Sequence, residues 1–118
     1  MERDARVWLW DVLDAARAIQ AFVAGQDVAS YAALPLVHSA VERKFEIIGE
    51  ALSQLSKRNP ELAPRIPDLR AIVGFRNLLI QGYAEVDHSI VWTAIQDSLP
   101  RLCQAVQVIF DELDRANG

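Results

Sequence analysis

The sequence predicts an all-α fold, a four- to five-helix up-and-down bundle in a single domain that covers residues 1–118. Apolar residues recur at spacings of three and four, glycine and proline separate these stretches, and no stretch alternates with a period of two. A chain of 118 residues and 13.2 kDa is long enough for one modest core. Its 52% apolar and 24% charged residues are typical of a soluble globular protein.

The first helix is expected from about Arg3 to Ala24, because Gly25 provides a stop. A short helical turn, about Ala29–Leu34, is expected before Pro35. The second helix is expected over about Leu36–Lys57. Its apolar residues alternate by threes and fours, which is typical of a bundle seam: Val37, Val41, Phe45, Ile48, Leu52 and Leu55.

Gly49 lies beside this seam and would let another helix approach closely, at a cost of about 1 kcal/mol relative to alanine. A proline-rich linker follows at residues 59–67, and Pro67 suits the first turn of the third helix. The last helical region is expected from about Asp87 to Asp114. Pro100 should kink or split it, because proline removes a backbone hydrogen bond and clashes with the preceding turn.

The third helix places an arginine where an apolar residue is expected. Leu69, Ile72 and Val73 define an apolar stripe, and Arg76 falls on the same stripe at i+7. A guanidinium that faces a core or an interface needs an anion. The sequence leaves two interpretations open: a structural ion pair with an acid on a neighbouring helix, or a phosphate-binding arginine at the floor of a cleft.

The end of this helix is predicted at Gly82, since glycine readily adopts the left-handed conformation of a helix cap. Gln81 would be the last helical residue, with Tyr83 just beyond it. On an uninterrupted helix, Arg76 and Gln81 would lie about 140° apart. They can therefore share a site only if the helix ends between them and Tyr83, or if a second subunit completes the site.

A family resemblance covers nearly the whole chain. The third helix reads Arg76-Asn77-Leu78-Leu79-Ile80-Gln81-Gly82-Tyr83 and is followed by Val86-Asp87 and Ile90-Val91-Trp92; upstream lie residues 40–43 and Ile47-Ile48-Gly49-Glu50-Ala51. In this order the motifs resemble the HepT-like branch of the HEPN superfamily.

The resemblance implies an α-helical homodimer, and many family members are the ribonuclease toxins of toxin–antitoxin pairs. Their antitoxin is a minimal nucleotidyltransferase that adds nucleotide to the motif tyrosine. For this chain it implies a site of Arg76, Gln81 and Tyr83, with RNA as substrate, Arg76 at the phosphate and Tyr83 as the modified residue. Asn77 would support the site.

The chain departs from the family pattern at one position, because Gln81 occupies the place of the motif histidine. A carboxamide cannot carry a proton at neutral pH, and general acid–base catalysis is worth about 10²–10⁴-fold in rate. Cleavage is therefore expected to be impaired unless another base substitutes. His88 is the only downstream histidine and is expected as a solvated residue in a helix's first turn. Gln81 is either a natural degeneration or an engineered silencing change.

A second function of a different class remains open. The chain could be a non-catalytic module that presents substrate or nucleotide to a separate nucleotidyltransferase. Under either function, we expect Glu46 or Glu50 on the second helix to orient Arg76 across the bundle.

No metal or cofactor is expected. Glu42, Glu46 and Glu50 form an i, i+4, i+8 line, which is typical of a solvated helix face. Carboxylate metal sites in helical bundles need Glu-x-x-His on facing helices. His38 precedes Glu42 by four residues, and nothing in the sequence completes that pair. Cys103 is alone, which excludes a disulfide framework and a cysteine zinc cluster.

The net charge of −4 argues against a simple nucleic-acid coat. Residues 57–76 nevertheless carry a local excess of three positive charges, which could form a basic rim for an RNA end or could be ordinary charge scatter. Neither a signal peptide nor a run of eighteen apolar residues is present, so we expect a cytoplasmic protein without a membrane segment.

Overall fold

The computed structural model describes residues 4–82 and 85–117, and within these ranges the chain is helical, with no β-strand. The helices are α1 (Ala5–Val23), α2 (Val28–Ala33), α3 (Pro35–Arg58), α4 (Leu69–Gln81), α5 (His88–Thr93) and α6 (Leu99–Asn117). A 3₁₀ turn, η1 (Ala63–Arg65), precedes α4, and a π-helical segment, η2 (Ala94–Ser98), joins α5 to α6. This confirms the all-α prediction.

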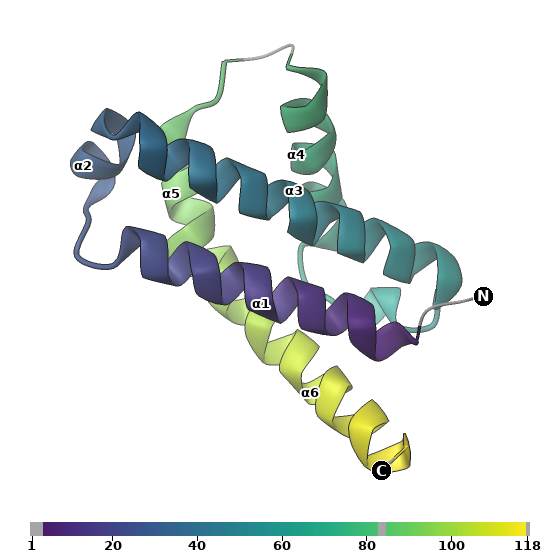
Figure 1. The fold of residues 1–118 in the computed structure, drawn as a ribbon. Helices are drawn as coiled ribbons and strands as arrows, with labels where there is room; N and C mark the ends of the chain where they lie inside the picture. Colours follow the sequence, from purple (N-terminus) through teal and green to yellow (C-terminus); the bar gives the residue numbers. More distant parts are fainter. Residues whose placement is uncertain (1–3, 83–84, 118) are drawn as a thin grey trace.

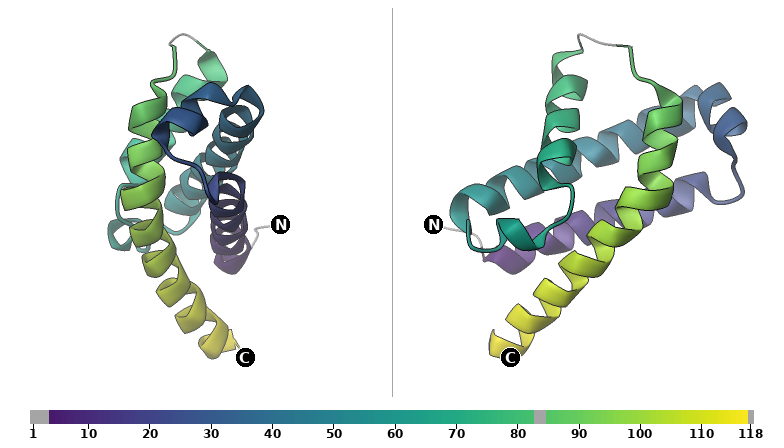
Figure 2. Two further views of the ribbon diagram at one scale, coloured as in Figure 1. Left: turned by 90° about the vertical axis from the view of Figure 1, so that its left-hand side faces the viewer. Right: turned by 180° about the vertical axis from the view of Figure 1, so that it is seen from behind.

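The two long helices α1 and α3 lie side by side and run in opposite directions (Figure 1). α4 packs against α3, and the rod formed by α5, η2 and α6 crosses the α1–α3 pair on one face (Figure 2). The short α2 connects α1 to α3 and also packs against α5. The far end of α6 extends beyond the other helices (Figure 1). No helix in the described ranges combines the length and apolar character needed to cross a bilayer.

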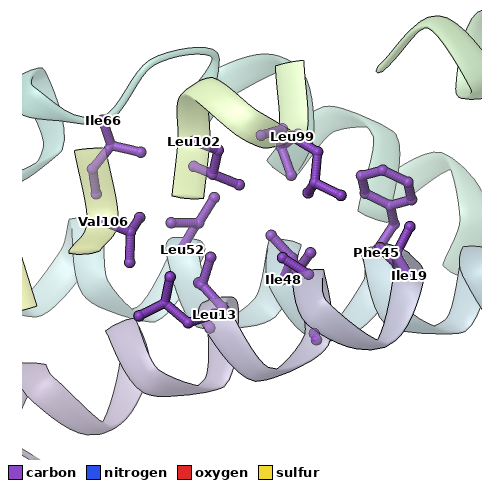
Figure 3. Close-up of a cluster of buried hydrophobic side chains, with 14 of the residues drawn as sticks. Leu13, Ile19, Phe45, Ile48, Leu52, Ile66, Leu99, Leu102 and Val106 are labelled. Carbon is purple, nitrogen blue, oxygen red and sulfur yellow. The ribbon is translucent and has the colours of Figure 1, made fainter. Parts of the chain in front are cut away.

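The core lies between α1, α3 and the α5–α6 rod. Figure 3 shows its central side chains, among them Leu13 from α1, Ile48 and Leu52 from α3, and Leu102 and Val106 from α6. These residues are all at most 5% exposed. The spacing of threes and fours predicted for α3 is thereby confirmed from Val41 onward, because Val41, Phe45, Ile48, Leu52 and Leu55 are all buried, whereas Val37 is only partly buried.

The helix boundaries follow local signals. α1 begins after Asp4, whose carboxylate accepts a hydrogen bond from the Arg6 backbone N–H at 2.8 Å; Arg3, the predicted start, lies outside the described residues. α2 begins at a reciprocal capping box between Asp27 and Ser30. α3 begins with Pro35 in its first turn, one residue before the predicted start.

Two proline predictions have different outcomes. The last helical region is disrupted beside Pro100 as expected, and the disruption takes the form of η2, where the Leu99 N–H bonds to the Ala94 carbonyl five residues back. The widened turn relieves the clash that a proline ring makes with an α-helical carbonyl. The prediction that Pro67 belongs to the first turn of the third helix is wrong. Asp68 adopts a left-handed conformation with φ 60°, and α4 begins only at Leu69.

Candidate active site

The stem of Arg76 occupies the space above Gly49. A Cβ atom added to Gly49 would clash with the Arg76 Cβ, lie 2.8 Å from its Cγ, and lie 3.4 Å from the Ile72 carbonyl oxygen. The predicted close approach at Gly49 is therefore present, and α4 is the helix that approaches. Only glycine leaves room for an arginine stem at this crossing.

The guanidinium of Arg76 ends at an ion pair across the two helices. Its Nη2 donates to a carboxylate oxygen of Glu50, and its Nη1 donates to the Asn77 side-chain oxygen at 2.8 Å. Glu50 also accepts a hydrogen bond from Gln54 at 3.1 Å. The side chains of Arg76 and Glu50 are 26% and 45% exposed, so the pair lies at the surface of the helical packing and not deep within it.

Of the two sequence interpretations of Arg76, the geometry shows the ion pair, and the phosphate-binding role stays a prediction. The acid on a neighbouring helix exists, and of the two candidates Glu50 makes the contact, whereas Glu46 pairs with Arg43 at 3.0 Å. The pair also opens to solvent. The Arg76 Nε is buried and has no hydrogen-bond partner within the described part of the chain, so this N–H group of the guanidinium is an unused donor there.

A surface hollow of about 270 Å³ lies beside this ion pair. It is lined from three helices by Trp8, Asp11, Arg43, Glu46, Ile47, Glu50, Ala51, Arg76 and Ile80. Three carboxylates and two guanidiniums line this hollow, so its wall carries a net negative charge. An anion can bind there only if it displaces Glu50 from Arg76, or if a further cationic group enters the site with it.

Gln81 and Gly82 end α4 in the predicted way. The helix is uninterrupted to Gln81, and Gly82 adopts the left-handed conformation with φ 65° while its N–H bonds to the Leu78 carbonyl at 3.0 Å. Gln81 is exposed. Since Arg76 faces α3 and Gln81 lies about 140° around the same helix, one chain alone does not bring the two side chains together. Tyr83 lies outside the described residues.

The helix α4 exposes large apolar side chains on more than one side. Ile72 is its one buried residue, while Leu78 and Ile80 are 50% and 57% exposed and lie about 200° apart around the helix. Gly74 adds no bulk one turn before Leu78, and a Cβ at that position would meet nothing within 4 Å. A helix with apolar residues on several faces ordinarily packs against more than one neighbour.

Comparison with known proteins identifies the family. The family model described as "Ribonuclease HepT-like" matches residues 12–109. The chain belongs to this HepT-like family. A relative from Methanocaldococcus jannaschii, named "Putative RNase MJ1380", is 29% identical over 92% of this chain and 98% of its own length. "Putative RNase TTE0752" from Caldanaerobacter subterraneus is 35% identical over 66% of this chain and 69% of its own length.

A third relative, "Probable ribonuclease HepT" from Thermococcus cleftensis, is 29% identical over 86% of this chain and 92% of its own length. No solved structure matches the chain significantly. The HepT-like assignment therefore rests on sequence, and its all-α expectation agrees with the fold described above.

Two arginines of the basic rim expected on this HepT-like chain pair with acids from outside the rim, and one acid of the rim pairs with an arginine outside it. Arg65 pairs with Glu112 of α6 at 2.8 Å, and Arg76 pairs with Glu50. Asp68 pairs in turn with Arg101 at 3.0 Å. Charge counting along residues 57–76 could not show this, because the acids Glu112 and Glu50 lie outside that window.

His88 does not lie beside Arg76. It begins α5 as expected, but its ring is packed and not solvated: it stacks on His38 with ring centroids 4.0 Å apart and planes at 28°. His38 precedes Gly49 by eleven residues on α3, which is about 16 Å along the helix. His88 therefore cannot replace the motif histidine beside Arg76 of the same chain.

The expectation that nothing completes the His38–Glu42 pair is wrong. His88 joins it, and one ligand atom from each of these three residues lies within 4.8 Å of the others. The His38 Nδ1 is 3.4 Å from the Glu42 Oε2. The sequence showed two of the three members through their i, i+4 spacing, whereas the third, His88, comes fifty residues after His38 on another helix.

Proposed function

We propose that this protein is a HepT-like ribonuclease toxin subunit that cleaves RNA without a metal ion in a cleft between two copies of the chain. The observation that carries the proposal is the Arg76 guanidinium, which Glu50 holds at the opening of a surface hollow in a chain of the HepT-like ribonuclease family. An ion pair with a purely structural role would be expected within the helix packing and not beside a hollow that is open to solvent.

Arg76 would act on the scissile phosphate. Its planar fork can donate two parallel hydrogen bonds to phosphate oxygens, and its side chain is 26% exposed at the ion pair with Glu50. In the reaction, the 2′-hydroxyl oxygen attacks phosphorus, the bond to the 5′-oxygen breaks, and a cyclic phosphate forms. One proton leaves the 2′-hydroxyl and one joins the 5′-oxygen, while Arg76 stabilises the charge on the phosphate oxygens.

The residue at position 81 limits this chemistry. A histidine there could accept or donate a proton near neutral pH, whereas Gln81 can only hold a water or a hydrogen bond. We therefore propose that cleavage by this form is impaired, with Arg76 still able to bind phosphate.

A second copy of the chain would complete the cleft. Ile80 is 57% exposed on α4 and lines the Arg76 hollow, where a second chain could cover it, and the 140° separation of Arg76 and Gln81 prevents one chain from forming the site alone. A two-fold pairing about α4 would place Gln81 of one protomer near Arg76 of the other, and bring a second Arg76 to offset the acidic wall.

We further propose that the antitoxin is a minimal nucleotidyltransferase that modifies Tyr83. The support is the motif Gln81-Gly82-Tyr83 at the end of α4, where the helix stops and the chain passes toward α5. Paired with such an enzyme, the protein would act in the cytoplasm.

The test compares RNA cleavage by three forms in the presence of a chelator: the protein itself, Gln81→His, and Gln81→His combined with Arg76→Ala. Gln81→His should raise the cleavage rate by about 10²–10⁴-fold, and Arg76→Ala should remove the gain. If position 81 has no effect on cleavage or on growth of an expressing cell while the nucleotidyltransferase is still bound, the protein is a non-catalytic binding module.

A further inference from the structure

Two imidazoles and a carboxylate meet between α3 and α5, away from the Arg76 hollow. The stacked rings of His38 and His88 adjoin Glu42, and the Nδ1 atoms of both histidines are buried without a hydrogen-bond partner among the described residues. The Tyr31 ring lies edge-on to both imidazoles at 6.2 and 6.0 Å, and its buried hydroxyl also has no partner in that part of the chain. Buried polar atoms are normally satisfied, so these unpartnered groups point to a bound ligand.

We propose that His38, Glu42 and His88 bind a divalent transition-metal ion of the zinc type. Imidazole nitrogen and carboxylate oxygen are ordinary zinc ligands, and three protein ligands leave one coordination position open. Calcium and magnesium are disfavoured, because they select sites made of oxygen atoms.

The geometry requires only a small adjustment. Two ligands of a tetrahedral zinc ion lie about 3.3 Å apart, given metal–ligand distances of about 2.0–2.1 Å. The three candidate atoms are already within 4.8 Å of one another. Rotation of the two rings out of their stack would close the difference, since nearly parallel rings direct their lone pairs side by side. His38 and Glu42 are fixed relative to each other by their i, i+4 spacing on α3.

The surroundings suit an ion that arrives from one side. The side chains of His38 and Glu42 are only 18% and 21% exposed, and Tyr31 closes the inner wall with no exposed surface. Glu42 also lines a hollow of about 440 Å³ between the end of α4 and α5, together with apolar residues such as Phe75 and Ile90. Because Glu42 lies both in the cluster and in the wall of this hollow, the open coordination position of the ion would face the hollow.

A metal ion at this site would hold two helices together and would take no part in the phosphate chemistry at Arg76. His88 is the first residue of α5, so coordination would tie the start of that helix to α3. The Arg76 site lies about 16 Å further along α3 and does not share a ligand with it. The proposal therefore stands independently of ribonuclease activity.

The direct test uses the unaltered chain with any histidine tag removed, because a tag binds the same ions. The chain has two histidines, so its imidazole NMR signals are two sets. Titrating the metal-stripped protein with Zn²⁺ should shift both sets together and saturate at one equivalent, while Mg²⁺ should shift neither. Unchanged signals, or a shift of one histidine alone, would overturn the proposal.

Variants assign the third ligand. Glu42→Gln should weaken Zn²⁺ binding, measured by calorimetry, by at least the roughly 10–100-fold that loss of an outer-shell group causes. The matched control is Glu46→Gln, one turn further along α3 and without an imidazole beside it, which should bind Zn²⁺ as the unaltered chain does. Equal weakening in both variants would show diffuse binding to exposed carboxylates and would also overturn the site. Far-ultraviolet circular dichroism checks that each variant is folded.

Discussion

Arg76 fills the volume that Gly49 leaves empty. The missing side chain on α3 allows the arginine stem to lie against the α3 backbone, and the guanidinium then reaches Glu50, the residue after Gly49. The helix crossing and the placement of the charged group therefore depend on the same glycine.

Gly49→Ala should destabilise the protein. Alanine is the better helix former by about 1 kcal/mol, but its Cβ would clash with the Arg76 stem, and overpacking of this kind costs typically about 1–3 kcal/mol. We expect a lower free energy of unfolding in urea. The control is Gly74→Ala on α4, where a Cβ meets nothing within 4 Å and stability should rise by up to about 1 kcal/mol. An unchanged stability for Gly49→Ala would show that the crossing can relax.

Glu50→Gln should separate positioning from stability. Because the Arg76–Glu50 pair is partly exposed, its loss should change the free energy of unfolding by less than about 1 kcal/mol. In the Gln81→His background, however, it should lower kcat more than it raises KM, since Arg76 loses the group that orients it. Glu46→Gln is the matched control. A purely structural role for Glu50 would leave kcat unchanged.

Ile80→Asp should prevent self-association. Ile80 is 57% exposed on α4 beside the Arg76 hollow, and an aspartate there would leave an unpaired charge in the proposed interface. Sedimentation should show a dimer for the unaltered chain and a monomer for the variant. Val108→Asp changes a 50% exposed residue of α6 in the same way and should remain dimeric. Dissociation by both variants, or by neither, would contradict an interface on α4.

Modification of Tyr83 predicts a mass change. Incubation of the protein with its nucleotidyltransferase and ATP should add nucleotide, and Tyr83→Phe should abolish the addition. Intact-mass spectrometry measures both outcomes. Tyr31→Phe is the control for the second tyrosine, which is fully buried and should not be modified. Addition that persists in Tyr83→Phe would assign the modification to another residue.

The cap of α5 should make stability depend on pH. Hydrogen bonds from the Ser89 hydroxyl and from the Ile90 and Ser89 backbone N–H groups lower the pKa of Asp87. A carboxyl whose pKa is lower in the folded state stabilises the fold above its unfolded pKa of about 4, and this contribution is lost as the pH falls through the folded value. Asp87→Asn keeps an oxygen acceptor but not the charge. Unaltered protein should therefore be more stable than Asp87→Asn at pH 7, with the difference shrinking in urea titrations below about pH 4. A difference independent of pH would exclude the charge as its source.

Much of the fold was predictable because its signals are local. Gly25 and Gly82 follow the ends of α1 and α4, and Pro35 begins α3, each through a conformational preference of one residue. Pro67 failed as a marker because the neighbouring Asp68 takes a left-handed conformation, which the sequence around it does not indicate.

The candidate site was predictable only in part. An acid opposite Arg76 was expected on charge grounds alone, but the choice of Glu50 over Glu46 depends on where α4 crosses α3. The approach of His88 to His38 could not be predicted, since it depends on how the start of α5 meets α2 and α3.

The π-helical segment η2 has a consequence for the register of the last helix. Its wider turn holds one more residue than an α-helix would over the same length, and the helices on either side keep their own faces. Deleting the exposed Asp97 should therefore let the segment close into a regular α-helix, while Leu102, Val106 and Ile109 stay in the core. The cost of the shortened segment would fall beside Pro100, whose ring would again meet an α-helical carbonyl, and not on the packing of α6.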